Sequence, residues 1–252
     1  MMNQQNQTEF IQNMLYRQPA LYEQVYKSDN YGVVKEIIER YLKRLPTSIL
    51  DIGCGTGRDL QYLSALCSDC VGIDYLPGMI DYAKSNYPNL SFHVGDMRSF
   101  RLGRTFDTIL ALGWVLNYAW TEEDLAKTLE TCQAHAQPNT LLILEMLNGG
   151  RLIGKTFRDF FEIDIDSFYA QATASYQYSR HQQILTRERV WKLPDSESVT
   201  DCCQYRLYFP AELKRLLRQY NFEIVGLFDD RSLQTSELDG ELLFAAAVYH
   251  GK

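Results

Sequence analysis

The sequence predicts an α/β fold in which a doubly wound, largely parallel sheet carries an antiparallel β insertion. Three observations lead to this prediction. Short apolar runs alternate with helical segments over the first 150 residues. A turn with three glycines follows the first of these runs. From about residue 151 the alternation stops, and segments with a period of two replace it.

Composition and charge limit the classes of function that need to be considered. The 252-residue chain is 46 % apolar, which is enough for a full hydrophobic core. A net charge of −7 and a pI near 5.2 disfavour nucleic acid as the main partner, because phosphate binding needs a basic surface. The polar N-terminus is not a signal peptide, and no apolar run approaches the ~20 residues of a membrane helix. We therefore expect a cytoplasmic protein without a membrane partner.

The six cysteines predict reduced thiols, not a metal site. Cys67 and Cys70 form a CxxC pair, but no second pair and no suitably spaced histidines accompany it. Cys202 and Cys203 are adjacent, which suits no common ligand set. The four histidines are scattered along the chain. We expect no metal ligands.

The first apolar run, residues 48–52, reads as a buried parallel strand. Gly53, Gly55 and Gly57 follow it at alternate positions. Glycine tolerates a positive φ and has no Cβ, so the backbone can turn sharply and lie against a ligand. Residues 58–66 then form a helix with leucines on one face. Strand, glycine turn and helix make up the first unit of a nucleotide-binding sheet.

The spacing of the glycines disfavours two common phosphate sites. A dinucleotide-binding turn reads G-x-G-x-x-G, and a phosphate-binding P-loop ends in Lys-Ser or Lys-Thr. This turn reads D-x-G-x-G-x-G from Asp51 and is followed by Arg58. It therefore suits a ligand without a pyrophosphate. An ordinary turn that needs glycine for packing is the alternative.

Acidic residues end the next two apolar runs. The second run ends in Asp74, near the ~20-residue spacing of an acid that binds ribose hydroxyls. The third ends in Asp96 and is followed by the apolar Met97. Residues 106–112 form a fourth strand. These acids are expected at the carboxyl edge of the sheet, where such folds bind ligands.

In this order and spacing, the motifs resemble those of the class I S-adenosylmethionine-dependent methyltransferases. The resemblance implies a Rossmann-like seven-stranded sheet, S-adenosylmethionine as the cofactor and S-adenosylhomocysteine as its product. It assigns the methionine end to Asp51 and the glycine turn, the ribose to Asp74, and adenine to Asp96 with Met97. The cofactor-binding residues that it implies are Tyr22, Asp51, Gly53, Cys54, Gly55, Gly57, Asp74, Tyr75, Met79, Asp96, Met97, Leu112 and Gly113.

Residues 8–26 are expected to be helical, with Pro19 at the start of a second short helix. Residues 20–26 are similar to the segment that the family places over its cofactor, which makes Tyr22 a candidate contact. The alternative is that Tyr22 and Tyr26, one helical turn apart, only pack against each other.

The acceptor side is expected to form from one loop and from the insertion. An aromatic-rich loop, residues 113–120, follows the fourth strand at the ligand edge. Its candidates are Trp114, Asn117 and Tyr118, and those of the insertion are Tyr169, Tyr176, Arg206 and Tyr208. The alternative is that the aromatic residues of the insertion form the core of a lid. No catalytic base is assigned.

The chain is expected to divide into four parts. Residues 1–44 cap the cofactor site, 45–150 form the binding core, 151–208 form the antiparallel acceptor lid, and 209–252 complete the core. The final segment should contribute one helix and two strands, which the resemblance to the family implies are an antiparallel pair at the edge of the sheet. The lid is expected to lie over the ligand edge because it interrupts the alternation after the fifth strand.

The resulting hypothesis is methyl transfer to N or O of a small-molecule acceptor. The fourth strand lacks an Asn/Asp-Pro-Pro-Tyr loop, and the layout is similar to N-methyltransferases of amino sugars and amino acids. A cofactor-binding regulatory subunit and a protein or nucleic-acid methyltransferase are the alternatives. A nicotinamide dehydrogenase is disfavoured by the glycine spacing. The acceptor, the methylated atom and the choice between monomer and homodimer stay open.

Overall fold

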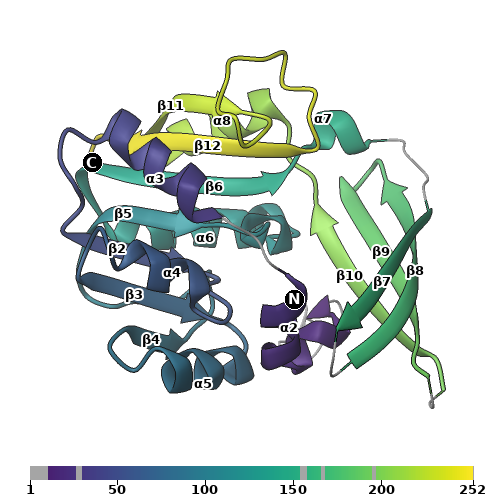
Figure 1. Cartoon of the computed structure of the whole chain (residues 1–252). Helices are drawn as coiled ribbons and strands as arrows, with labels where there is room; N and C mark the ends of the chain where they lie inside the picture. Colours follow the sequence, from purple (N-terminus) through teal and green to yellow (C-terminus); the bar gives the residue numbers. More distant parts are fainter. Residues whose placement is uncertain (1–10, 27–29, 154–157, 166–167, 195–196, 252) are drawn as a thin grey trace.

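The computed structural model describes residues 11–26, 30–153, 158–165, 168–194 and 197–251. It contains two β-sheets, and the N-terminal helix α2 (Pro19–Val25) lies between them (Figure 1). None of the helices within these ranges is long and apolar enough to cross a membrane.

The larger sheet has seven strands and confirms the predicted Rossmann-like class. Its order is β11-β12-β6-β5-β2-β3-β4. Strand β12 runs antiparallel to β6 and β11, and the other pairs are parallel. The strands are β2 (Ser48–Ile52), β3 (Asp69–Asp74), β4 (Ser91–Val94), β5 (Phe106–Ala111), β6 (Ala136–Leu147), β11 (Phe222–Phe228) and β12 (Leu242–Tyr249).

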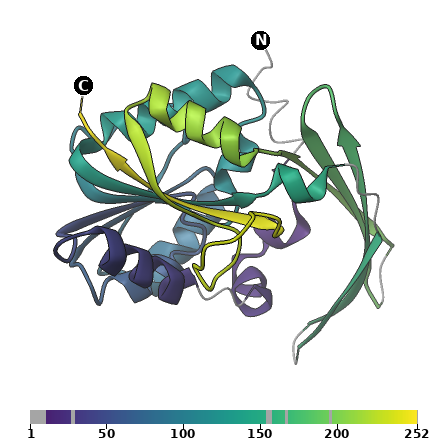
Figure 2. The ribbon, with the colours of Figure 1, turned by 90° about the horizontal axis from the view of Figure 1, so that it is seen from above.

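Helices cover both faces of this sheet (Figure 2). Leu50 and Ile52 share a core cluster with one group of helices, whereas Ile49 packs with the other group. Strand β2 is therefore buried along its whole length, as expected for a parallel strand with two covered faces. The first group is α6 (Glu122–Ala134) and α8 (Pro210–Gln219), and the second is α3 (Asn30–Tyr41), α4 (Arg58–Leu63) and α5 (Pro77–Asn86).

The smaller sheet has five antiparallel strands in the order β1-β10-β9-β8-β7. Four of them come from the segment between β6 and α8. This segment leaves the core after Asn148 through the short helix α7 (Gly149–Leu152) and returns at Tyr208, where the Gly149 N–H donates to the Tyr208 carbonyl at 2.8 Å. The strands are β1 (Ile11–Gln12), β7 (Arg158–Ile165), β8 (Phe168–Ser179), β9 (Ile184–Lys192) and β10 (Val199–Arg206).

The prediction of a helix over residues 8–26 is wrong at its start. Ile11 pairs with Cys203 of β10, so β1 covers what would otherwise be an unpaired strand edge. The Asn13 side chain then caps a short 3-10 helix, η1 (Met14–Arg17), and Pro19 begins α2. Residues 8–10 lie outside the described ranges.

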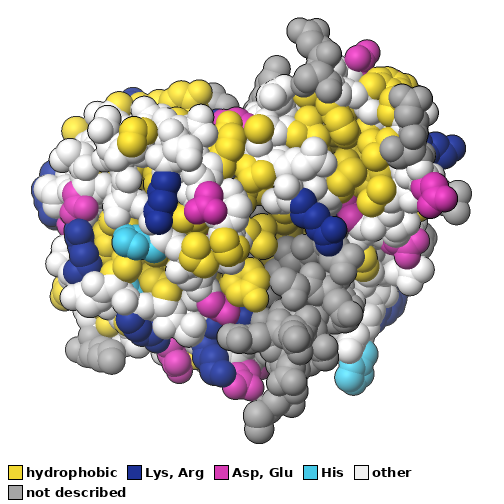
Figure 3. Space-filling view, turned by 90° about the horizontal axis from the view of Figure 1, so that it is seen from below, with side chains coloured by type: hydrophobic (Ala, Val, Ile, Leu, Met, Phe, Trp, Pro, Cys, Tyr) yellow, Lys and Arg dark blue, Asp and Glu magenta, His cyan; other side chains and the backbone are white. Residues whose placement is uncertain are grey.

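An apolar cluster joins the N-terminal helices to the smaller sheet. Leu15 and Leu21 pack against Ile163 and Trp191, and further apolar side chains surround them. Figure 3 shows apolar side chains gathered on the part of the surface that the smaller sheet forms, at the upper right of the view. The N-terminal helices therefore belong with the insertion in packing terms, although they are far from it in sequence.

Candidate active site

A cavity lies at the carboxyl ends of β2, β3 and β5, with η1 and α2 on its other side. Eleven of the thirteen residues expected to bind the cofactor line it, and Gly57 and Met79 do not. The eleven are Tyr22, Asp51, Gly53, Cys54, Gly55, Asp74, Tyr75, Asp96, Met97, Leu112 and Gly113.

The glycine turn forms the floor of the cavity. Gly55 has a φ of +54°, and no heavy atom lies within 4 Å of the position that a Cβ would take. Gly53 has a φ of +76°, and a Cβ there would overlap the side chain of Val115. Glycine permits the left-handed turn at both positions, the close approach of Val115 at Gly53, and open space for a ligand at Gly55.

Gly57 and Met79 have packing roles. A Cβ on Gly57 would lie 2.6 Å from the Phe92 ring and 3.1 Å from Ala83, so glycine permits close packing here. Met79 is 2 % exposed on the inner side of α5. Leu76, one residue before α5, lines the cavity.

Asp74 is fixed at the tip of β3 by two backbone donors. One carboxylate oxygen accepts from Gly55 N and the other from Leu76 N, each at 2.8 Å. Burial raises the pKa of this carboxyl, and the backbone hydrogen bonds oppose that shift. The glycine turn and the acid therefore hold each other in place.

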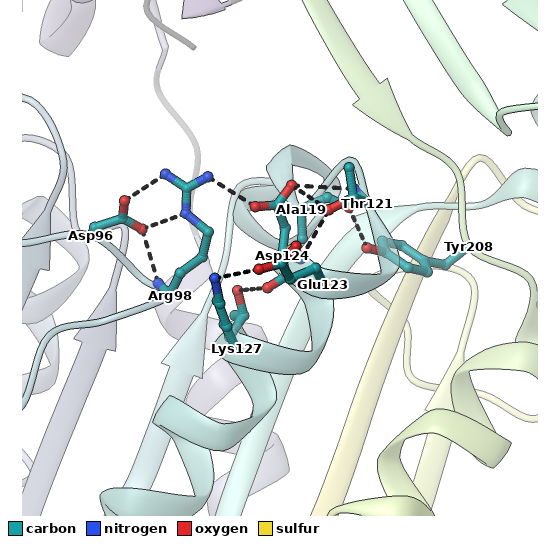
Figure 4. A network of polar contacts seen from close by, with 9 residues as sticks. Asp96, Arg98, Ala119, Thr121, Glu123, Asp124, Lys127 and Tyr208 are labelled. Atoms are coloured by element: carbon teal, nitrogen blue, oxygen red, sulfur yellow. Dashed lines mark hydrogen bonds and ion pairs between the residues drawn. The ribbon is translucent and has the colours of Figure 1, made fainter. Parts of the chain in front are cut away.

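Asp96 is held by an arginine that the sequence analysis missed. Its carboxylate accepts from Arg98 Nε at 2.8 Å and from Arg98 Nη2 at 2.5 Å (Figure 4). Arg98 also donates to Asp124 at 3.0 Å. Burial alone would raise the pKa of Asp96, but the hydrogen bonds from Arg98 outweigh it and lower the pKa. Asp96 and Arg98 both line the cavity, so this end of it carries an ion pair.

Further carboxylates make the opposite end of the cavity acidic. Asp51 is 3 % exposed, and its pKa is raised well above the usual range by burial and by the charges of Asp59 and Asp74. Asp59 also lines the cavity. Its Oδ1 is buried and accepts no hydrogen bond from any described residue. Asn30 donates to Asp59 Oδ2 at 3.4 Å and to Glu145 at 3.3 Å. This end therefore suits a positively charged ligand group.

One acceptor candidate, Tyr118, lines the cavity. Its hydroxyl lies 3.1 Å from that of Tyr16 in η1. Trp120 lines the cavity too, and its indole N–H donates to the Gln204 carbonyl at 2.8 Å. The sequence offered no signal for Tyr16, because its segment was expected to be an ordinary helix.

The other loop candidates, Trp114 and Asn117, lie in packed surroundings. The Trp114 ring meets the Tyr205 ring edge-on, with centroids 6.0 Å apart. Asn117 is fully buried, donates to the Arg206 carbonyl at 2.6 Å and accepts from Leu147 N at 3.0 Å. The Asn117 amide thus joins the loop to both β10 and β6.

The insertion candidates lie away from the cavity. Arg206 forms ion pairs with Glu122 and Glu212, so its charge is used inside the fold. Tyr208 is fully buried, and its hydroxyl donates to the Ala119 carbonyl at 2.9 Å (Figure 4). This placement does not agree with the expectation that these two side chains face the acceptor.

The two remaining tyrosines of the insertion make contacts within the smaller sheet and its apolar cluster. Tyr169 is 39 % exposed and donates to Glu162 at 2.8 Å. Tyr176 is half-buried and packs with the cluster that contains Tyr205. Neither lines the cavity. Within the described ranges, no group of three or more His, Cys, Asp or Glu side chains is arranged to hold a metal ion.

Comparison with known families identifies the core of the chain. Residues 49–139, which carry the glycine turn, Asp74 and Asp96, match the family model for the methyltransferase domain. This part of the chain is a methyltransferase domain. The fold of the chain as a whole agrees with a solved S-adenosylmethionine-dependent methyltransferase from Clostridium acetobutylicum, with a TM-score of 0.80 and 16 % identity over 95 % of this chain and 100 % of that one.

Curated relatives of the chain include two proteins named as N,N-dimethyltransferases. The chain is 31 % identical over 119 residues to the dTDP-3-amino-3,4,6-trideoxy-alpha-D-glucopyranose N,N-dimethyltransferase of Streptomyces venezuelae, covering 46 % of this chain and 50 % of that protein. It is 31 % identical over 112 residues to the dTDP-4-amino-2,3,4,6-tetradeoxy-D-glucose N,N-dimethyltransferase of Saccharopolyspora spinosa, covering 44 % and 45 %. The chain thus spans about half the length of the curated relatives it matches.

The cavity of the methyltransferase domain fits S-adenosylmethionine in its distribution of charge. This cofactor carries a positive sulfonium and an ammonium group. The buried Asp59 Oδ1, which accepts no hydrogen bond from the described residues, offers an acceptor to such a cation. The acids beside the glycine turn would repel the pyrophosphate of a dinucleotide. Domain and cavity together indicate S-adenosylmethionine as the cofactor.

Asp59 should make cofactor binding depend on pH. Burial raises its pKa to about 6, and the nearby Arg58 and Asn30 oppose that shift. The raised pKa stabilises the free folded protein at low pH, and this contribution is lost as the pH rises through about 6. A cofactor ammonium needs the ionised form, so S-adenosylhomocysteine should bind about tenfold more weakly at pH 5 than at pH 7.

Calorimetry across this pH range, on the wild type and on Asp59→Asn, tests that prediction. The variant cannot ionise at this position, so its pH dependence should be much shallower than that of the wild type. Identical profiles for the two proteins would show that another group, such as Asp51, controls the titration.

Proposed function

We propose that the protein transfers a methyl group from S-adenosylmethionine to a small-molecule acceptor. The observation that carries this proposal is the cavity itself, which joins the glycine turn and Asp74 to a wall of aromatic side chains. Sites on α/β sheets of this kind lie at the carboxyl ends of the strands, as this cavity does.

The roles of the binding residues follow from their chemistry. Asp74, fixed by Gly55 and Leu76, would accept hydrogen bonds from the ribose hydroxyls. Asp51 and Asp59 would hold the ammonium of the methionine end. Asp96, paired with Arg98, would contact the adenine amino group. Two opposed ends, one acidic and one ion-paired, would therefore fix the direction in which the cofactor lies.

The chain contributes to the reaction mainly by positioning and by exclusion of water. When bound, the cofactor supplies a methyl group that is already activated by a positive sulfonium. Tyr16 and Tyr118 form the wall of the cavity, and burial raises the pKa of Tyr16 to about 12, so this hydroxyl stays neutral at pH 7. Neutral hydroxyls can orient an acceptor, and a dry, ordered site favours an in-line displacement. We assign no catalytic base.

An amine is the acceptor class that we favour. The curated relatives act on amino sugars according to their names, and the layout of the insertion led to the same expectation. The acidic balance of the chain argues against nucleic acid as the acceptor. A cytoplasmic location and a monomeric or homodimeric state belong to this proposal as well. A cofactor-binding subunit without catalysis is the alternative, and it would bind the cofactor without turnover.

Calorimetry with S-adenosylhomocysteine and with NAD tests the cofactor assignment. We expect S-adenosylhomocysteine to bind to the cavity and NAD to show no measurable heat of binding. Methyl transfer to a panel of amines, followed by mass spectrometry, then tests catalysis. Binding of NAD in place of S-adenosylhomocysteine would refute the proposal, and cofactor binding with no methylated product would favour the regulatory alternative.

A further inference from the structure

The inner face of the smaller sheet holds two buried arginines from β9. Arg187 is 7 % exposed and Arg189 is 4 % exposed. Across the described residues, Asp201 is the carboxylate that forms ion pairs with them, at 3.8 Å from Arg187 and 3.4 Å from Arg189. Two buried positive charges therefore face one negative charge. A buried charge without a counter-charge destabilises a folded protein, so this imbalance needs an explanation.

The closer partner of Asp201 is Arg189, which leaves Arg187 poorly matched. Arg189 donates from Nε to Asp201 and from Nη2 to Asn13, both at 3.4 Å. Arg187 instead donates from Nη2 to the Cys203 thiol at 3.1 Å, and burial raises the pKa of that thiol, which keeps it neutral. Arg187 Nε is buried and makes no hydrogen bond with any described residue. A guanidinium with an unused donor is suited to bind a planar or tetrahedral anion.

Arg187 lies behind the aromatic wall of the cavity. Its guanidinium lies 5.6 Å from the centre of the Tyr205 ring, and that ring lies 5.4 Å from the ring of Tyr118. Tyr118 and its hydroxyl partner Tyr16 line the cavity directly. The charge of Arg187 also acts on the pKa of Tyr16, in the direction that lowers it. The rings of Tyr205 and Tyr118 therefore lie in succession between the buried cation and the cofactor cavity.

We propose that Arg187 binds a compact anionic group of the methyl acceptor, a carboxylate or a phosphate. The inference rests on the proposed methyl transfer, because it places the acceptor between the two sheets, beside the Tyr16–Tyr118 wall. The anion compensates the unmatched positive charge and accepts from the unused Nε–H. The other end of the acceptor then faces the cofactor cavity. Arg187 is thus a specificity residue that selects anionic acceptors over neutral ones.

The three tryptophans provide probes around this position. The Trp114 ring contacts Tyr205, the Trp120 indole donates to Gln204, and the Trp191 indole donates to Asp201 at 2.7 Å. Protein labelled with ¹⁵N at the indole nitrogens and saturated with S-adenosylhomocysteine is titrated with sodium phosphate, sodium acetate or sodium chloride to the same ionic strength. We expect phosphate or acetate to shift the Trp114 signal saturably, and chloride not to do so. The anion that binds with the higher affinity, phosphate or acetate, indicates which anionic group of the acceptor Arg187 binds.

Variants of the two arginines complete the test. Arg187→Gln should weaken the binding of the anion that binds more tightly to the wild type by at least about tenfold, which is the loss expected for a charge-assisted hydrogen bond. Arg189→Lys, a change on the same face of the same strand, should retain the anion effect. If Arg187→Gln does not fold, Arg187→Lys, which keeps the charge but loses Nε, should show the same loss of affinity.

The outcomes separate this inference from the proposed function. Failure of the wild type to bind S-adenosylhomocysteine overturns the proposed function. Normal S-adenosylhomocysteine binding, with shifts that are linear, equal for all three salts or unchanged in the Arg187 variants, overturns the role of Arg187 alone.

Discussion

Replacing Asp74 by alanine should weaken S-adenosylhomocysteine binding by about 1–3 kcal/mol, or roughly fivefold to 150-fold. The carboxylate is the group at the tip of β3 that can accept from ribose hydroxyls, and it also holds Gly55 N and Leu76 N at 2.8 Å. Its removal takes away charge-assisted hydrogen bonds and loosens the glycine turn at the same time. Calorimetry on the folded variant measures the loss.

A second variant and a control separate these two effects of Asp74. Asp74→Asn keeps one oxygen acceptor, so we expect a smaller loss of affinity than for alanine. Asp81→Ala removes an exposed carboxylate from α5 and should leave binding unchanged. Equal affinity of Asp74→Ala and the wild type would mean that the ribose binds elsewhere.

Replacing Asp201 by alanine should destabilise the fold by about 3–5 kcal/mol. Asp201 is 2 % exposed and accepts hydrogen bonds from Met14 N at 3.0 Å, from Trp191 Nε1 at 2.7 Å and from Arg189. Its loss leaves two buried guanidinium groups without a counter-ion among the described residues, and it removes the hydrogen bond that joins the N-terminal segment to β10. Urea unfolding of the variant and the wild type measures the difference in the free energy of unfolding.

Glu188→Ala is the matched control for Asp201, because Glu188 is an exposed acid on the neighbouring strand β9. We expect it to change the free energy of unfolding by no more than about 0.5 kcal/mol. A loss of similar size in both variants would show that the number of acidic side chains matters here, and not the burial of Asp201.

The sequence was most informative where local chemistry alone dictates structure. Strand β2, the glycine turn and Asp74 follow from an apolar run, a need for positive φ, and the spacing of an acid after the turn. The antiparallel pair of β11 and β12 also agrees with the expectation, which came from the resemblance to the methyltransferase family. Most residues predicted for the cofactor site therefore do line one cavity.

The acceptor side of the site could not be predicted in the same way, because contacts between residues far apart in the sequence determine its structure. Arg206 and Tyr208 were expected to face the acceptor from the insertion, but contacts with Glu122 and with the Ala119 carbonyl hold them inside the fold. Tyr16 is placed at the cavity by a segment that follows the pairing of β1 with β10, and no local sequence pattern predicts that pairing. Arg187 gave no signal either, since an arginine in an alternating strand usually points to solvent.

The pairing of β1 with β10 has a consequence for how the chain acquires its structure. Met14 and Asp201 are 187 positions apart along the chain, yet a hydrogen bond joins them. A contact of such high sequence separation forms late, because the intervening loop must close first. On the ribosome, the N-terminal segment has to wait until β10 has emerged. The core sheet up to β6 can form earlier, so the wall that carries Tyr16 is expected to be among the last parts to assemble.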